Sequence, residues 1–361
     1  MQAGKVRVLI IDDSAVVRSI LKIALSAHPQ IEVVGMAADG VEGLLQIKKL
    51  RPDVCTLDVE MPRMNGLQVL DHVAGKIPVA FVMCSTLTQA GAHTTLEALQ
   101  KGAFDYVAKP QQGGLARDQR FRRELHEKIL AAARGKKRLR NLQRGGGSGG
   151  PVPSGTGRLP PSKARGWIVG IGISCGGPQT LYEMLPMFPS DFVPILITQH
   201  MPAAFTRSFA THLNKVCAME VCEAGHGMAI EHGRIYVAPG SHHMLLERVG
   251  VGLRVKLDDG PEVSGHRPSV DVMFSSLARV CPTRCVAVIM TGMGRDGTAG
   301  MQLLHRAGAR TIAQDEATSL VYGMPKAAVA AGCVERSVAL KDIPQTIADL
   351  VEGKAPALAS G

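Results

Sequence analysis

The sequence predicts an α/β protein of two domains, each built on a doubly wound parallel sheet. Short apolar runs alternate with segments of helical spacing along most of its 361 residues, which is the pattern of βαβ units. A chain of this length holds roughly two domains. Residues 144–163 have almost no apolar side chains and many Gly, Ser and Pro, so they indicate a flexible linker between the two.

Five strand–helix units are expected before the linker. Apolar runs predict strands at residues 6–11, 31–37, 54–59, 79–85 and 104–109. Helical spacing predicts helices at residues 14–25, 41–50, 67–74, 94–102 and 121–133. This order predicts a (βα)5 domain over residues 1–125, followed by a basic helix and the linker over residues 126–165.

The alternation resumes after the linker and predicts a second α/β domain over residues 166–355. Strands are expected at residues 167–173, 193–199, 233–239, 285–293 and 310–314. Helices are expected at residues 178–188, 205–216, 269–280, 297–308 and near 325–332. Residues 244–257 alternate apolar and polar side chains around a Gly-containing turn, which predicts an antiparallel hairpin inserted into this domain.

The net charge of +10 comes mainly from one segment. Residues 117–144 hold eleven Lys and Arg against three acidic residues, and the rest of the chain is nearly neutral. A solvated helix explains this segment, with contact to an acidic partner or to membrane phosphates as the alternative. Because neither domain is basic as a whole and aromatic residues make up 4% of the chain, we expect no nucleic-acid partner.

The eight cysteines are scattered and form no CxxC pair, so reduced thiols are expected rather than a zinc cluster. No apolar run approaches the roughly 18 residues of a membrane span, and the N-terminus lacks the pattern of a signal peptide. We therefore expect a cytoplasmic protein without membrane insertion.

Polar side chains lie where the strands of the first domain end. They belong to Asp12, Asp13, Asp58, Ser85 and Lys109. The carboxyl ends of parallel strands meet at one edge of the sheet, where ligands bind. Three carboxylates repel one another unless a cation lies among them, and oxygen ligands suit Mg²⁺. The sequence therefore predicts a magnesium site at this edge.

Residues 5–125 resemble the receiver domain of two-component response regulators, through IIDDS, LDVEMPRMNG, the Ser85 hydroxyl and YVAKP. The resemblance implies that Asp58 accepts a phosphoryl group from a histidine kinase. It implies that Lys109 and Ser85 contact the phosphoryl oxygens. It also implies a Mg²⁺ ion held by Asp12, Asp13, Asp58 and the backbone carbonyl of Glu60.

In the second domain, VGIGISCGGP at residues 169–178 places Ser174 in a GxSxG turn after a strand. Such a turn exposes a nucleophile, although a serine that caps the next helix explains it equally well. A dinucleotide loop is disfavoured because the glycines have the spacing GxGxxxG and the next strand ends in Gln199 rather than an acid. A nucleophile needs a base, and His200 lies at the end of that neighbouring strand. Asp296, after the strand near 285–293, completes a possible triad, although it could instead cap the helix that follows.

The motifs GISCGG, TQHMP, HRPSVDVMF and TGMGRDG over residues 166–350 resemble the catalytic domain of the chemotaxis protein-glutamate methylesterases. The resemblance implies Ser174 as nucleophile, His200 as general base and Asp296 as the acid that orients it. The backbone amide of Met293, helped by that of Cys175, would bind the oxyanion. The usual motif has threonine where this chain has Cys175 and asparagine where it has Arg295.

The two resemblances together imply a phosphorylation-regulated hydrolase that removes methyl esters from glutamates of chemoreceptors and deamidates receptor glutamines, for chemosensory adaptation. The esterase site would need no cofactor. Two alternatives belong to other classes: a response regulator whose second domain only binds a partner, and a nucleotide-dependent enzyme.

Overall fold

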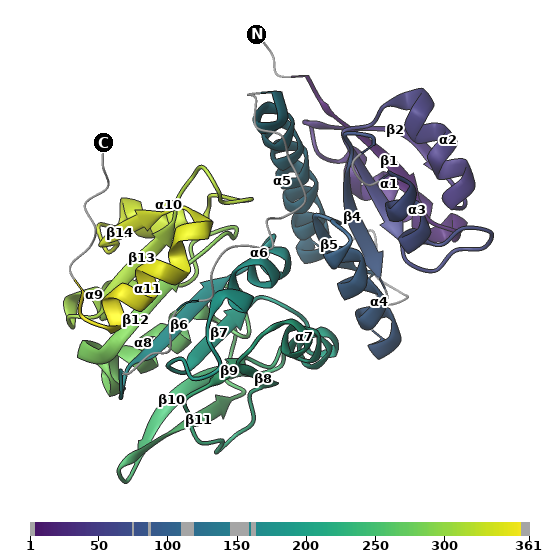
Figure 1. The fold of residues 1–361 in the computed structure, drawn as a ribbon. Helices are drawn as coiled ribbons and strands as arrows, with labels where there is room; N and C mark the ends of the chain where they lie inside the picture. Colours follow the sequence, from purple (N-terminus) through teal and green to yellow (C-terminus); the bar gives the residue numbers. More distant parts are fainter. Residues whose placement is uncertain are drawn as a thin grey trace. The chain divides into compact units, whose positions relative to one another are not determined.

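The computed structural model describes residues 4–73, 76–85, 88–109, 119–144, 159 and 164–354. The chain forms two compact units, Met1–Pro153 and Ser154–Gly361, which Figure 1 shows as purple-to-blue and teal-to-yellow ribbons. Apart from residues 144 and 159, the expected linker at 144–163 lies outside the described residues.

The first unit is a five-stranded parallel sheet of order β2-β1-β3-β4-β5 with helices on both faces. Its strands are β1 (Val6–Ile11), β2 (Ile31–Ala37), β3 (Val54–Asp58), β4 (Ala80–Ser85) and β5 (Asp105–Ala108). Its helices are α1 (Ala15–Ser26), α2 (Gly40–Leu50), α3 (Gly66–Val73), α4 (Gln89–Gln100) and α5 (Gln119–Arg144). The expected (βα)5 fold is confirmed.

Local sequence signals explain where these helices begin. The side chain of Ser14 accepts the Val17 amide at the start of α1, and Asp39 accepts two amides at the start of α2, as expected of helix caps. Helix α4 begins at Gln89, five residues before the expected start at 94, because Thr88 caps it. Helix α5 runs unbroken through residue 126 and buries Leu125 in the same core as the rest of the unit.

The second unit contains a seven-stranded parallel sheet of order β14-β13-β12-β6-β7-β9-β8 and a separate antiparallel pair, β10-β11. Its strands are β6 (Ile168–Ile173), β7 (Ile195–Gln199), β8 (Glu220–Glu223), β9 (Arg234–Val237), β10 (His243–Val249), β11 (Gly252–Asp258), β12 (Cys285–Ile289), β13 (Arg310–Gln314) and β14 (Arg336–Val338). Its helices are α6 (Gly177–Met184), α7 (Ala203–Val216), α8 (Val270–Val280), α9 (Thr298–Arg306), α10 (Met324–Ala330) and α11 (Ile343–Val351).

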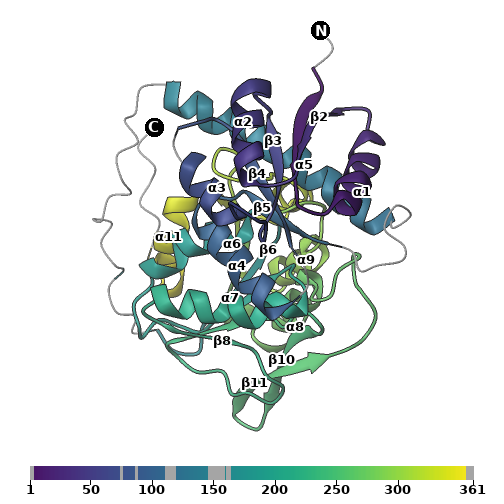
Figure 2. The same ribbon diagram turned by 90° about the vertical axis from the view of Figure 1, so that its right-hand side faces the viewer.

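The doubly wound parallel sheet and the hairpin insertion of the second domain are confirmed. Figure 2 shows the hairpin β10-β11 projecting from this unit, and its inner side chains join the core under α8. Three elements were not expected from the sequence: β8 and β14, which are short, partly polar edge strands, and the last helix, α11.

The glycines of strand β6 have a packing role. A Cβ atom at Gly172 would lie 2.2 Å from Val270 Cγ1, and one at Gly170 would lie 2.6 Å from Leu277 Cδ1. Both distances are too short for real contacts, so glycine at these positions is what lets helix α8 lie directly on the strand. Helix α8 is thereby held against the strand that directly precedes Ser174.

Candidate active site

Three strands of the second sheet bring Ser174, His200 and Asp296 to one edge. Strand β6 lies between β7 and β12 at the centre of the sheet, where the strand order reverses direction. Ile173 at the end of β6 pairs with Gln199 at the end of β7, so the next residues, Ser174 and His200, are neighbours. Asp296 lies in the turn that follows β12. Ligands of open α/β sheets bind at such a reversal point.

The three side chains are hydrogen-bonded in series. His200 Nδ1 lies 3.0 Å from Ser174 Oγ, and His200 Nε2 lies 2.7 Å from Asp296 Oδ2. The ring nitrogen nearer the backbone, Nδ1, is therefore the one that faces the serine. The imidazole is nearly buried, with 8% of its side chain exposed. This arrangement can deprotonate a serine hydroxyl and hold the resulting imidazolium.

Asp296 is buried and accepts hydrogen bonds from several donors besides His200. They are Ser269 Oγ at 2.8 Å, the Val270 amide at 2.8 Å, the Asp271 amide at 3.1 Å and the Gly297 amide at 3.0 Å. Burial raises the pKa of Asp296, but the hydrogen bond and charge of His200, together with the bonds from Val270 and Ser269, outweigh it and hold the pKa at about 2. The carboxylate therefore stays ionised at neutral pH.

The hydrogen bonds of Asp296 give it a role other than capping α9, the helix that follows it in the sequence. Its side-chain oxygens accept amides from the first turn of α8, residues Val270 and Asp271, which lies far away in the sequence. Asp296 therefore caps α8 and binds His200 at the same time. The serine and valine of the HRPSVDVMF segment thus have a role in the site that the sequence reasoning did not identify.

Ser174 does not cap the following helix. The N-cap of α6 is Gly176, in the left-handed region at φ 72°, and no side chain caps the helix. The Ser174 amide is bonded to the Thr291 carbonyl, and the Ser174 hydroxyl lies 3.0 Å from His200 Nδ1. The explanation of the GxSxG turn as a capping serine is therefore wrong in this structure.

The loop after β12 carries the candidate oxyanion donor. Within the described part of the chain, no acceptor is seen for the Met293 amide, and Gly294, at φ 81°, turns the loop directly after it. Cys175 is buried, and its carbonyl accepts a hydrogen bond from Thr291 Oγ1 at 3.0 Å. Arg295 is exposed beside Asp296.

The strand ends of the first unit bring together the acidic cluster. Asp12, Asp13 and Asp58 each offer an oxygen, and these oxygens lie within 4.8 Å of one another. Lys109 Nζ lies 2.7 Å from Asp12 Oδ2 and 2.7 Å from Asp58 Oδ2. Burial and the neighbouring Asp12 raise the pKa of Asp58 to about 6, although Lys109 and the Val59 amide oppose the rise. The negative charge of this cluster is therefore incompletely compensated.

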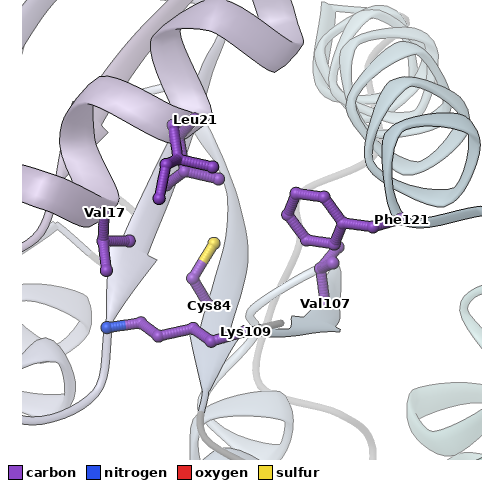
Figure 3. A pocket seen from close by; sticks show the side chains of 7 residues that line it. Val17, Leu21, Cys84, Val107, Lys109 and Phe121 are labelled. Atoms are coloured by element: carbon purple, nitrogen blue, oxygen red, sulfur yellow. The ribbon is translucent and has the colours of Figure 1, made fainter. Parts of the chain in front are cut away.

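The other two expected receiver residues also lie near this edge. The Ser85 hydroxyl is buried and donates to the Gly91 carbonyl at 3.2 Å, in the first turn of α4. The stem of Lys109 borders a small apolar cavity of about 20 Å³, roughly the space of one water molecule. Figure 3 labels six of the residues that line it between α1, the sheet and α5: Val17, Leu21, Cys84, Val107, Lys109 and Phe121. Ile20 also lines the cavity. Glu60 lies in the exposed turn two residues after Asp58.

Comparisons with known proteins match both units. A family model described as CheB methylesterase matches residues 169–347, and one described as response regulator receiver domain matches residues 8–117. The protein-glutamate methylesterase/protein-glutamine glutaminase 1 of Caulobacter vibrioides is 46% identical, covering 97% of this chain and 99% of the relative. The protein-glutamate methylesterase/protein-glutamine glutaminase of Pyrococcus abyssi is 43% identical, covering 96% and 94%.

A solved structure also resembles the second unit. It is the CheB methylesterase catalytic domain of Thermotoga maritima, with a TM-score of 0.50 and 36% identity, covering 51% of this chain and 98% of that one. Among the described residues, no helix combines the length and the apolar character that a membrane span requires.

Proposed function

The chain belongs to the CheB protein-glutamate methylesterase/protein-glutamine glutaminase family with an N-terminal receiver domain, and we propose that Ser174, His200 and Asp296 are its catalytic triad. The chain is thus a hydrolase of glutamyl methyl esters and glutamine amides. The observation that carries the triad is the continuous pair of hydrogen bonds from Ser174 through His200 to Asp296. The substrates are methyl-accepting chemoreceptors.

In the first half of the reaction, Ser174 Oγ attacks the carbonyl carbon of the glutamyl methyl ester. His200 Nδ1 takes the hydroxyl proton, and Asp296 stabilises the imidazolium through Nε2–H. The tetrahedral intermediate then collapses, its bond to the methoxy oxygen breaks, and His200 returns the proton to release methanol. With a glutamine substrate the leaving group is ammonia, and the same acyl-enzyme forms.

In the second half, water attacks the acyl-enzyme. His200 Nδ1 accepts a proton from the water, and the same proton returns to Ser174 Oγ as the acyl bond breaks. The product is a glutamate carboxyl group. The Met293 amide, which has no acceptor in the described part of the chain, is suited to bind the oxyanion of both tetrahedral intermediates. The Cys175 amide is the second candidate donor.

We test the triad by measuring methanol release from a methylated chemoreceptor with the full-length chain. Ser174→Ala removes the nucleophile, and kcat is expected to fall on the order of a million-fold. Ser190→Ala is the matched control, because Ser190 is an exposed serine outside the site and should retain normal activity. More than a tenth of wild-type activity in Ser174→Ala would exclude the triad.

The receiver unit regulates this activity through phosphorylation of Asp58 by a histidine kinase. The donor set fits Mg²⁺, because Asp12, Asp13 and Asp58 offer clustered carboxylate oxygens, whose combined negative charge a cation would offset. The Glu60 carbonyl is the expected fourth protein ligand. When bound, the ion would neutralise charge on the transferring phosphoryl group. Lys109 is already paired with Asp58 and can contact the phosphoryl oxygens, while Ser85 must leave Gly91 to do so.

Labelling with radioactive acetyl phosphate tests the acceptor. Incorporation should require Mg²⁺ and should disappear in Asp58→Asn, because the attacking carboxylate oxygen is gone. Asp71→Asn is the control, since the exposed Asp71 is ion-paired with Lys101 away from the acidic cluster, and this variant should be labelled normally. Labelling of Asp58→Asn at the wild-type rate would place the acceptor elsewhere.

A further inference from the structure

One contact of His200 belongs to neither of its two hydrogen bonds. The imidazole of His266 stacks on it, with 3.7 Å between the ring centroids and 9° between the ring planes. The hydrogen bonds from His200 to Ser174 and Asp296 lie in the plane of its ring, so they leave the faces of the ring to other contacts. His266 covers one of these faces.

The loop that carries His266 is built to hold the ring in place. Val263 and His266 exchange backbone hydrogen bonds of 3.1 and 3.0 Å. Between them Ser264 and Gly265 both have positive φ, 55° and 79°, which is the geometry of a tight two-residue hairpin turn. The Ser264 hydroxyl donates to Asp271 Oδ2 at 3.1 Å, which ties the turn to helix α8.

A buried histidine is hydrogen-bonded to both ends of the loop that carries His266. His243 Nδ1 lies 3.1 Å from the Ser269 amide, and its Nε2 lies 2.9 Å from the Pro261 carbonyl. Because the amide must donate and the carbonyl must accept, the His243 ring carries its proton on Nε2. The segment from Pro261 to Ser269 is therefore anchored at each end by one side chain that is 2% exposed.

The loop also continues directly into the residues that hold Asp296. Ser269 and Val270 donate to the Asp296 carboxylate. One continuous segment thus orients the acid of the triad at its end and covers the base at its tip. The hydrogen bonds of His200 leave its ring free to tilt and to move along the ring normal. The segment that carries His266 restricts both of these motions.

We infer that His266 is a positioning residue for the esterase reaction, whose imidazole face fixes the plane of His200 and shields it from water; this rests on the triad proposed above. A fixed plane keeps Nδ1 aligned with Ser174 Oγ, and misplacement of a reacting group by about 1 Å costs roughly 100-fold in rate. No proton passes through His266.

Two substitutions in the full-length chain separate this role from general stability. His266→Ala removes the covering face, and kcat for methanol release is expected to fall roughly 10- to 100-fold while KM changes less than two-fold. His266→Phe keeps a flat ring of similar size without ring nitrogens, and it should restore kcat to within about three-fold of wild type, since ring stacking rather than a hydrogen bond carries the effect.

The rate at which a fluorophosphonate probe labels Ser174 provides a second readout that requires no receptor. It should fall in His266→Ala, recover in His266→Phe and stay normal in the control His305→Ala, because His305 lies on α9 and contacts Thr311. Circular dichroism and unfolding midpoints show whether each variant folds, and a folded His266→Phe alone decides the question if His266→Ala does not fold.

Three results would overturn the inference. They are wild-type kcat in folded His266→Ala, a loss in folded His266→Phe as large as in His266→Ala, or a loss that appears only in KM. Ser174→Ala distinguishes this failure from that of the triad. If it is inactive while the His266 variants are normal, the triad stands and the positioning role is wrong. If it is active, both are wrong.

Discussion

Each of the two units places a buried aspartate at the carboxyl edge of a parallel sheet, yet the pKa values of the two carboxylates are shifted in opposite directions. Asp58 in the first unit has its pKa raised to about 6 by burial and by Asp12, against the opposing effects of Lys109 and Val59. Asp296 in the second unit is also buried, but His200, Val270 and Ser269 hold its pKa at about 2. The sheet topology determines where each carboxylate lies, and the charges and hydrogen-bond donors around it determine the direction of its pKa shift.

This difference matches the tasks of the two sites. In the proposed triad, Asp296 must remain an anion throughout the reaction, because it orients His200 and stabilises the imidazolium. In the proposed phosphoryl transfer, Asp58 acts beside the carboxylates of Asp12 and Asp13, and a bound cation would offset the negative charge that Lys109 leaves uncompensated. Each of the following variants changes one side of this comparison.

The largest effect is expected from Asp296→Asn, which keeps the shape of the side chain and removes its charge. The amide no longer fixes the His200 tautomer, so kcat should fall about ten-thousand-fold, less than in Ser174→Ala because the nucleophile remains. Methanol release measures the loss. Activity within ten-fold of wild type would mean that the charge of Asp296 is not needed.

Asp58→Asn should stabilise the receiver unit at neutral pH by about 3 kcal/mol, roughly 100-fold in the unfolding equilibrium. The folded pKa of Asp58 is raised above the unfolded value of about 3.9, so the stability contributed by its protonated form is present at low pH. That contribution is lost as pH rises through about 6. Urea unfolding at pH 7 and pH 4.5 measures this, and the advantage of the variant should shrink at the lower pH. A variant less stable than wild type at pH 7 in the absence of Mg²⁺ would contradict the assignment.

Ser269→Ala sharpens the comparison by removing one donor from Asp296 without touching its charge. The 2.8 Å bond from Ser269 Oγ is lost while the Val270 and Asp271 amides remain, so we expect a fall of about ten-fold in kcat. Ser190→Ala serves again as the control. An effect as large as that of Asp296→Asn would show that the hydroxyl does more than complete the donor set.

The smallest effect concerns communication between the units. The composition of residues 144–163, rich in Gly, Ser and Pro, predicts a flexible tether of about 20 residues, which would give the units an effective concentration near millimolar. We expect that phosphorylation weakens a docking interaction of the receiver by about 1–2 kcal/mol and thereby changes activity about ten-fold. A phosphodonor with Mg²⁺ should raise methanol release by the full-length chain by about this factor and leave Asp58→Asn unchanged. Equal stimulation of Asp58→Asn would show that the regulation does not depend on phosphorylation of Asp58.

The sequence alone predicted the α/β class, two sheet-containing units and several of the residues that meet at the edge of each sheet. Alternating apolar runs define parallel strands, and a polar residue directly after each strand must lie at the common edge, which is why Asp12, Asp58, Ser174 and His200 could be grouped without coordinates. The edge strands β8 and β14 escaped this reasoning because they are short and partly polar.

Only the tertiary structure decided how the grouped residues act. Whether Asp296 caps α8 or α9, which nitrogen of His200 faces Ser174, and whether Ser174 caps a helix all depend on contacts between segments distant in the sequence. The stacking of His266 on His200 likewise arises from a loop whose position is set by the buried His243. Local sequence fixes secondary structure and strand ends, whereas the donors around a buried charge, and therefore its pKa, come from packing that brings remote segments together.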